Sequence, residues 1–223
     1  MASSQPEPWR FYALNIQEMS FMEKLVGVIT VPGETFKHIT EKDLKKGLFV
    51  ILVIAILSGL AGATYFLKRD IDTPFGDIRS QMSPFVAVIF SITYLIRWFA
   101  PSLLLAVFAK VMIGVGSAKR LLAMTSFGSI PLLVQQILRV IDSQIITSTE
   151  IKQIIASSFS GDGFVTQFLN EGLKVLNIFE IITVILTVYA VRENYGSSTG
   201  KAAQVTVLAY LAYVFVRTLL PLI

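Results

Sequence analysis

Five long apolar runs constrain the fold of this chain more than any other feature of its sequence. The runs are Gly47–Leu67, Pro84–Ala109, Leu121–Leu138, Val175–Val191 and Ala202–Leu222. A helix needs about 20 apolar residues, with a range of roughly 17 to 25, to cross a bilayer. The runs do not alternate as barrel strands do, and an isolated strand would leave its backbone unsatisfied in lipid. We therefore expect an all-α polytopic membrane helix bundle with five transmembrane helices.

The composition supports a membrane protein and excludes several kinds of chemistry. Charged residues make up 15% of the chain, whereas a soluble domain carries about 25%. The chain has no cysteine and one histidine, which excludes disulfides, thiolate metal sites and a metal site built from several histidines. No catalytic motif is present, and no basic run alternates with aromatic residues. We expect no cofactor, no enzymatic activity and no nucleic-acid partner.

The distribution of lysine and arginine predicts the orientation of the chain. The N-terminal segment and the loops on its side of the membrane carry 11 basic residues, against 6 on the other side. Basic residues favour the cytoplasmic side, so we expect a cytoplasmic N-terminus and an outward or lumenal C-terminus. The predicted parts are a cytoplasmic segment, 1–46, and a five-span domain, 47–223, with an outer loop at 142–172.

The N-terminal segment contains two amphipathic stretches. In the stretch Ile16–Ile29 the apolar residues Phe21, Met22, Leu25 and Ile29 share one helical face, and a second short helix begins near Pro32. One interpretation places both helices in the cytoplasmic interface of the bilayer. The other packs them on the cytoplasmic end of the bundle. In the first interpretation the lysines near anionic head groups are Lys37, Lys42, Lys45 and Lys46.

Polar residues inside the apolar runs are candidates for a functional site, because charges within a membrane are costly. Six polar residues form the predicted intramembrane layer: Arg97, Gln135, Gln136, Asn177, Glu180 and Arg217. Glu180 and Arg217 have the most similar expected depth in the membrane, so they are the best matched candidates for an ion pair. The layer is either a polar cavity of a small transporter or channel, or a structural ion pair with hydrogen bonds between helices.

Small residues recur every four positions in the first run, at Ala55, Gly59 and Ala63. This spacing lets two helices approach closely. It predicts a packing face, which serves either the bundle itself or the association of two copies of the chain.

Three stretches, in this order, resemble the Yip (Ypt-interacting protein) family of membrane proteins. Val31-Pro32-Gly33-Glu34-Thr35-Phe36 resembles the family's entry to the first span. Gly114-Val115-Gly116-Ser117, followed by Ser129-Ile130-Pro131, resembles its glycine turn and third span. Asn177-Ile178-Phe179 and Ser198-Thr199-Gly200-Lys201-Ala202 resemble its fourth span and the turn into the fifth.

The resemblance implies a five-span integral membrane protein with a cytoplasmic N-terminus. For eukaryotic members it implies vesicle traffic, small GTPase partners, membrane shaping and hetero-oligomers. This chain lacks the Asp-Leu-Tyr-Gly-Pro stretch of those members and has a short N-terminal segment, which favours a prokaryotic member. The leading hypothesis is a non-enzymatic membrane-organising scaffold or trafficking adaptor that forms homo- or hetero-oligomers, and the alternative is a small transporter or channel around Glu180.

Overall fold

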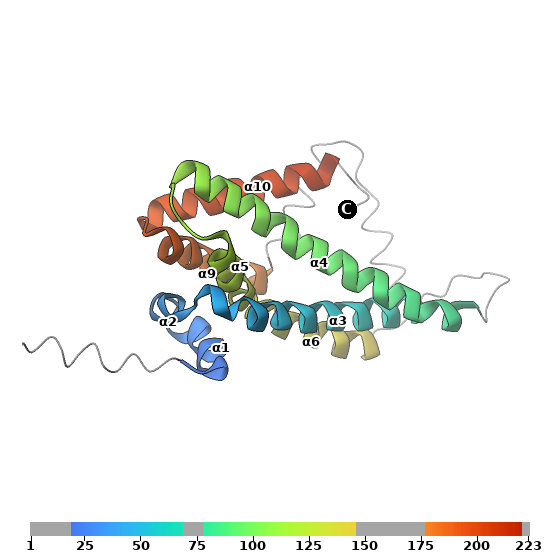
Figure 1. The fold of residues 1–223 in the computed structure, drawn as a ribbon. Coiled ribbons are helices and arrows are strands. Elements are labelled where there is room, and N and C mark those ends of the chain that lie inside the picture. Colours follow the sequence, from blue (N-terminus) through green and yellow to red (C-terminus); the bar gives the residue numbers. More distant parts are fainter. Residues whose placement is uncertain (1–18, 69–77, 146–176, 220–223) are drawn as a thin grey trace, which may run out of the picture.

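The computed structural model describes residues 19–68, 78–145 and 177–219, and within these ranges every regular element is a helix (Figure 1). The helices are α1 (Phe21–Thr30), α2 (Pro32–His38), the 3-10 turn η2 (Glu41–Asp43), α3 (Leu44–Lys68), α4 (Ile78–Met112), α5 (Ala118–Gly128), α6 (Ile130–Ile145), α9 (Ile178–Tyr195) and α10 (Thr199–Leu219). The all-α class is thus confirmed. Most of the predicted outer loop, 142–172, lies outside the described residues.

Three of the described helices are long and apolar enough to cross a membrane. They are α3 with the preceding turn, α4 and α10, and a fourth span results if the bent pair α5 and α6 is taken as one. Helix α9 is the predicted fourth span, but its 18 residues include Glu180, Arg192 and Glu193. These three charges keep α9 out of the set of candidate spans, so the described helices give three or four candidate spans and do not confirm the predicted five.

The predicted third span is broken into two helices. Helices α5 and α6 meet at Ser129 with a bend of 41°. Pro131 explains the break, because proline lacks the N–H of a helical hydrogen bond and its ring clashes with the carbonyl one turn earlier. The Ser129 hydroxyl donates to the Thr125 carbonyl at 2.8 Å, so part of the freed backbone remains satisfied.

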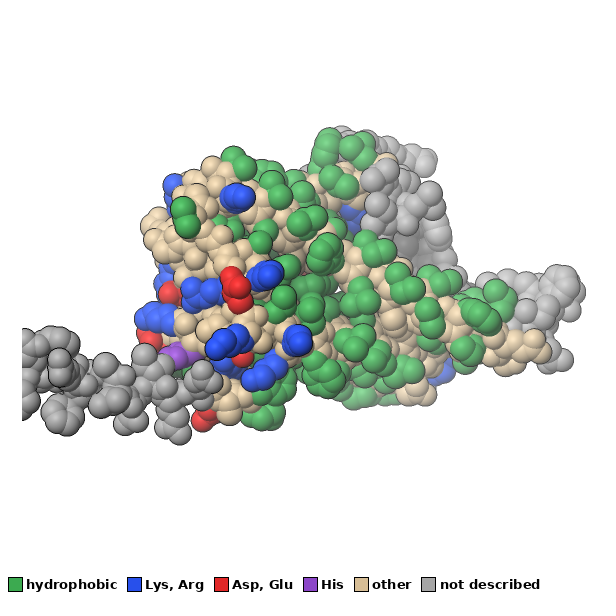
Figure 2. All heavy atoms as spheres, viewed as in Figure 1, with side chains coloured by type: hydrophobic (Ala, Val, Ile, Leu, Met, Phe, Trp, Pro, Cys, Tyr) green, Lys and Arg blue, Asp and Glu red, His purple; other side chains and the backbone are tan. Residues whose placement is uncertain are grey.

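Helix α3 lies at the centre of the packing. It contacts α4, α5 and α6, while α10 packs against α4 and α9. The buried core between them is built from aliphatic and aromatic side chains, among them Ile51, Ile54, Leu121, Met124, Phe127 and Val205. Large apolar residues also cover much of the outer surface (Figure 2), as a lipid-facing bundle requires.

The N-terminal helices pack on one end of this bundle. Helix α1 contacts α5, with the Phe21 and Phe127 rings 5.8 Å apart, and α2 contacts α9. A capping box begins α1: Ser20 Oγ accepts from the Glu23 N–H, and the Ser20 N–H donates to Glu23 at 2.6 Å. That backbone bond lowers the pKa of the Glu23 carboxyl. The described part of the N-terminal segment therefore shares its core with the spans.

Candidate functional site

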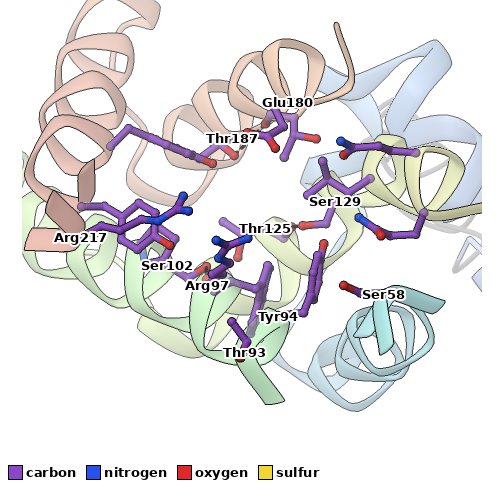
Figure 3. Close-up of a pocket in the computed structure, with 18 of the residues that line it drawn as sticks. Ser58, Thr93, Tyr94, Arg97, Ser102, Thr125, Ser129, Glu180, Thr187 and Arg217 are labelled. Carbon is purple, nitrogen blue, oxygen red and sulfur yellow. Dashed lines mark hydrogen bonds between the residues drawn. The ribbon is translucent and has the colours of Figure 1, made fainter. Parts of the chain in front are cut away.

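A cavity of about 600 Å³ lies among the long helices (Figure 3). Residues of α3, α4, α5, α6, α9 and α10 line it, so distant parts of the sequence build one site. Cavities that hold small molecules in proteins measure about 300 to 1,000 Å³. The size and the many contributing helices make this cavity the candidate functional site.

Four charged residues line the cavity, each from a different helix. They are Arg97 of α4, Arg139 of α6, Glu180 of α9 and Arg217 of α10. Figure 3 shows Arg97, Glu180 and Arg217 around the same space. All three arginines act electrostatically on the Glu180 carboxylate. Glu180 and Arg217, the pair matched by depth, thus line the same cavity.

Two neighbouring glutamines of α6 also reach the cavity. Gln135 and Gln136 are both buried, and the exposed fraction of Gln136 is 2%. Within the described part of the chain, Gln136 Oε1 and the Tyr94 hydroxyl have no hydrogen-bond partner. Buried polar atoms in proteins are almost always hydrogen-bonded to protein or to another molecule. These two atoms are therefore available to a molecule in the cavity.

The start of α9 explains how Glu180 is positioned. Asn177 does not line the cavity; its side-chain oxygen caps the helix by accepting from the Phe179 N–H at 2.9 Å and the Glu180 N–H at 3.1 Å. The cap fixes the first turn, and the positive end of the helix dipole favours a carboxylate there. Thr183 and Thr187 continue the same face into the cavity.

The structure thus brings together five of the six residues of the predicted layer, and it adds others. The added polar residues include Ser58, Thr93, Tyr94, Ser102, Thr125, Ser129, Arg139, Thr183, Thr187, Tyr210 and Tyr213. Helical spacing is the signal that finds several of them: Arg139 lies one turn after Gln135, and Tyr210 lies two turns before Arg217. Run length alone does not find Arg139, because this residue directly follows the third apolar run, Leu121–Leu138.

The four lysines predicted at the membrane interface lie at the end of the bundle that carries α1 and α2. The side chains of Lys42, Lys45 and Lys46 are exposed, and Lys37 pairs with Glu34 at 2.8 Å. The hydrogen bond to Glu34 raises the pKa of Lys37. Figure 2 shows most of the visible basic side chains gathered at this end and many apolar side chains over the middle of the face.

The small residues of the first span face other helices of the same chain. Ala55, Gly59 and Ala63 are all buried. A Cβ added at Gly59 would lie 2.2 Å from Ser91 Oγ and 2.5 Å from the Ala87 carbonyl oxygen of α4. Gly59 therefore permits the close approach of α3 and α4.

The glycine turn, one of the family-like stretches, contacts other elements at the end of the bundle near α2. Asn194 donates to the Ser117 carbonyl at 3.0 Å, and a Cβ at Gly116 would collide with the Tyr195 ring. Arg120 donates to the Ile39 carbonyl at 2.9 Å. The glycine turn, the end of α9 and the segment after α2 thus form one connected structure.

Comparison with protein families identifies the family of the chain. No curated protein and no solved structure matched the chain. A family model, the Yip1 domain, matches residues 26–220. This range covers most of the sequence and includes every helix from α2 to α10. The chain is an integral membrane protein related to membrane trafficking, and it belongs to the Yip1 domain family.

Proposed function

We propose that the protein is a non-enzymatic scaffold that organises the bilayer through its N-terminal helices, with its N-terminus in the cytoplasm. The observation that carries the proposal is an apolar stripe on the outer face of α1. Met22, Val26 and Ile29 are spaced as one helical face and are 64%, 59% and 50% exposed. The opposite face, with Gly27 and Val28, is buried against the bundle.

This arrangement suits a helix that lies in the membrane interface. An apolar face enters the region between head groups and acyl chains, while neighbouring cations attract anionic lipids. Lys42, Lys45 and Lys46 supply such cations at the start of the first span. The sequence had placed Leu25 on the same face as Met22. The structure instead turns Leu25 towards the core and leaves Val26 outside.

Depth-dependent fluorescence quenching in reconstituted vesicles tests the proposal. The chain has no cysteine, so a fluorophore attached to Val26→Cys reports this site alone, and one attached to Glu34→Cys serves as the polar reference. We expect lipids carrying a quencher near the head groups to quench the Val26 probe and not the Glu34 probe. Equal, water-like fluorescence at both positions would refute an interfacial α1.

Membrane shaping is tested with the same helix. The triple variant Met22→Ser, Val26→Ser and Ile29→Ser removes the stripe, and Val115→Ser is the control because Val115 is an exposed valine of the turn before α5. We expect wild type and control to change the size distribution of anionic vesicles and the triple variant to leave it unaltered. If the triple variant changes the vesicle size distribution as much as wild type does, the apolar stripe has no role in membrane shaping.

Family membership extends the proposal to protein partners, with a small GTPase as the first candidate. Purification from the native membrane in mild detergent, with and without guanine nucleotides, tests it by mass spectrometry of the purified complex. A stoichiometric partner released by nucleotide supports an adaptor. A chain purified alone or only with its own copies supports lipid organisation without a GTPase.

The cavity favours a second candidate, a small transporter or channel around Glu180. Glu180→Gln separates the two functions, since it keeps the shape of the side chain and removes its charge. Loss of a measured flux with unchanged thermal stability supports transport. A lower melting temperature, with no flux in wild type, assigns Glu180 to the structure of the bundle.

A further inference from the structure

We propose that the cavity among α4, α6, α9 and α10 binds a phosphate group, carried either by the head group of a phospholipid or by soluble phosphate. The inference uses the site of the second candidate function, but it requires binding and no flux. It is independent of the interfacial role of α1, which lies at the end of the bundle.

The charge of the cavity selects an anion. The described lining contains three arginines, Arg97, Arg139 and Arg217, and one carboxylate, Glu180. Among the described lining residues, positive charges therefore outnumber negative ones, in a part of the protein where a charge needs a compensating group. Arg97 and Arg217 also interact with other groups of the chain. A guanidinium has five N–H donors, so such contacts leave donors for a ligand.

The placement of the arginines favours phosphate over a carboxylate or chloride. The three arginines come from three helices and line one cavity, and Figure 3 shows Arg97 and Arg217 reaching it from α4 and α10. Guanidinium pairs with phosphate through two parallel N–H···O bonds. A tetrahedral phosphate presents oxygens in several directions at once, whereas a planar carboxylate presents two in one plane.

The neutral groups indicate what accompanies the phosphate. The Tyr94 hydroxyl is able to donate to a phosphate oxygen. Gln136 Oε1 needs a donor, and the Glu180 carboxylate attracts one. An ammonium or hydroxyl group attached to the phosphate supplies that donor, as in the head groups of phosphatidylethanolamine and phosphatidylglycerol.

The apolar part of the lining and the volume of the cavity agree with a lipid. Ile89, Phe90, Leu105 and Leu132 line the cavity beside the polar groups. A volume of about 600 Å³ holds a head group with part of its glycerol backbone, and far exceeds what phosphate alone requires. A phospholipid thus satisfies both the charged and the apolar walls.

Binding to the purified full-length protein in detergent tests the proposal, with affinity taken from the ligand dependence of the melting temperature. The probes are short-chain phosphatidylglycerol, short-chain phosphatidylethanolamine, inorganic phosphate, sodium chloride and a diacylglycerol of the same chain length. We expect a phosphate-bearing probe to raise the melting temperature and the diacylglycerol and chloride not to. Stabilisation by phospholipid alone identifies a lipid, and equal stabilisation by inorganic phosphate identifies a soluble ligand.

Variants locate the binding. Arg139→Gln is expected to weaken the affinity about tenfold or more, because a hydrogen bond to a charged group is lost. Lys110→Gln is the control, since it removes an exposed cation of α4 outside the cavity and should leave the affinity unchanged. Tyr94→Phe removes only a hydroxyl and should weaken binding severalfold. It keeps the proposal testable if Arg139→Gln does not fold.

Several results would overturn the proposal. They are stabilisation by none of the phosphate-bearing probes, stabilisation by diacylglycerol to the same extent, and affinities of the cavity variants equal to that of Lys110→Gln. Flux measurements separate this inference from the transport candidate. Phosphate binding without flux leaves the inference standing and removes transport, whereas a flux without phosphate binding does the reverse.

Discussion

Replacement of Lys24 by methionine should release α1 from the bundle. Lys24 Nζ lies 2.7 Å from Asp43 Oδ2, and the two side chains are only 7% and 5% exposed. Asp43 also accepts from the Thr40 N–H at 3.0 Å and lies 3.8 Å from Lys46 Nζ. This cluster connects α1 to the turn that begins the first span, so its loss acts on the docking of α1.

The expected size of the effect follows from burial. Removal of one partner from a buried ion pair costs about 3 to 5 kcal/mol, because the other charge is left buried. Lys46 and the Thr40 hydrogen bonds still compensate part of the Asp43 charge, which favours the lower end of the range. A cost of about 3 kcal/mol corresponds to a change of about a hundredfold in the docking equilibrium of α1.

Cysteine labelling measures this equilibrium directly, since the chain has no cysteine of its own. Val28 is a fully buried residue on the inner face of α1, so the labelling rate of Val28→Cys reports the undocked fraction. Lys24→Met should raise that rate about a hundredfold. Met22→Cys lies on the exposed face and should react at the same rate in both backgrounds.

Two further variants distinguish the ion pair from a general loss of stability. Lys42→Met removes an exposed lysine of the same segment and should leave the Val28→Cys rate unchanged. Lys24→Met combined with Asp43→Asn should recover most of the docking, because no buried charge remains and the asparagine oxygen still accepts from the Thr40 N–H. An unchanged Val28→Cys rate in Lys24→Met, or no recovery in the double variant, would refute the reasoning.

Three other predictions concern the helices themselves. Gly59→Ala should lower the unfolding free energy by about 1 to 3 kcal/mol, because the added Cβ would collide with the Ala87 carbonyl. Gly200→Ala is the control, since a Cβ at Gly200 meets no other atom of the described residues and should leave the unfolding free energy unchanged. Thermal unfolding in detergent compares the two variants. Asn177→Ala should cost about 1 kcal/mol in the same assay through the lost cap of α9. The capping hydrogen bonds lower the pKa of Glu23. The contribution of the Glu23 carboxylate to the stability of α1 is therefore present above pH 4.5 and is lost as the pH falls through the lower pKa of the folded state. Amide exchange of α1, corrected for intrinsic rates, should show this loss in wild type and not in Glu23→Gln.

The parts of the fold that follow from run length alone could be predicted. The first, second and fifth runs correspond to α3, α4 and α10, since about 20 apolar residues in lipid leave a helix as the only satisfactory backbone structure. The all-α class follows in the same way. Run length is a weaker guide where charge interrupts the run, and α9 is such a case because it carries Glu180 and two further charges near its end.

The burial of Lys24 could not be predicted, because it depends on a contact across 19 positions of the chain. A lysine in a short amphipathic helix normally extends to water. Here it is paired with an aspartate that the next turn positions. The division of the apolar residues of α1 into an inner and an outer face has the same origin. Periodicity shows that Phe21, Leu25, Met22 and Val26 occupy neighbouring faces, and only the partner helix decides which face is covered.

The position of the cavity follows from the break in the third span. Non-helical backbone at membrane depth is tolerated only where it is covered by protein or lines a cavity. Ser129 sits at the break, lines the cavity and is itself 2% exposed. The next turns of α6 then carry Gln135, Gln136 and Arg139 into the same space. In this chain, the proline of the third run and the glutamine side chains within about two turns after it thus indicate the position of the polar cavity. Arg97 of α4, Glu180 of α9 and Arg217 of α10 supply charged groups to the same cavity.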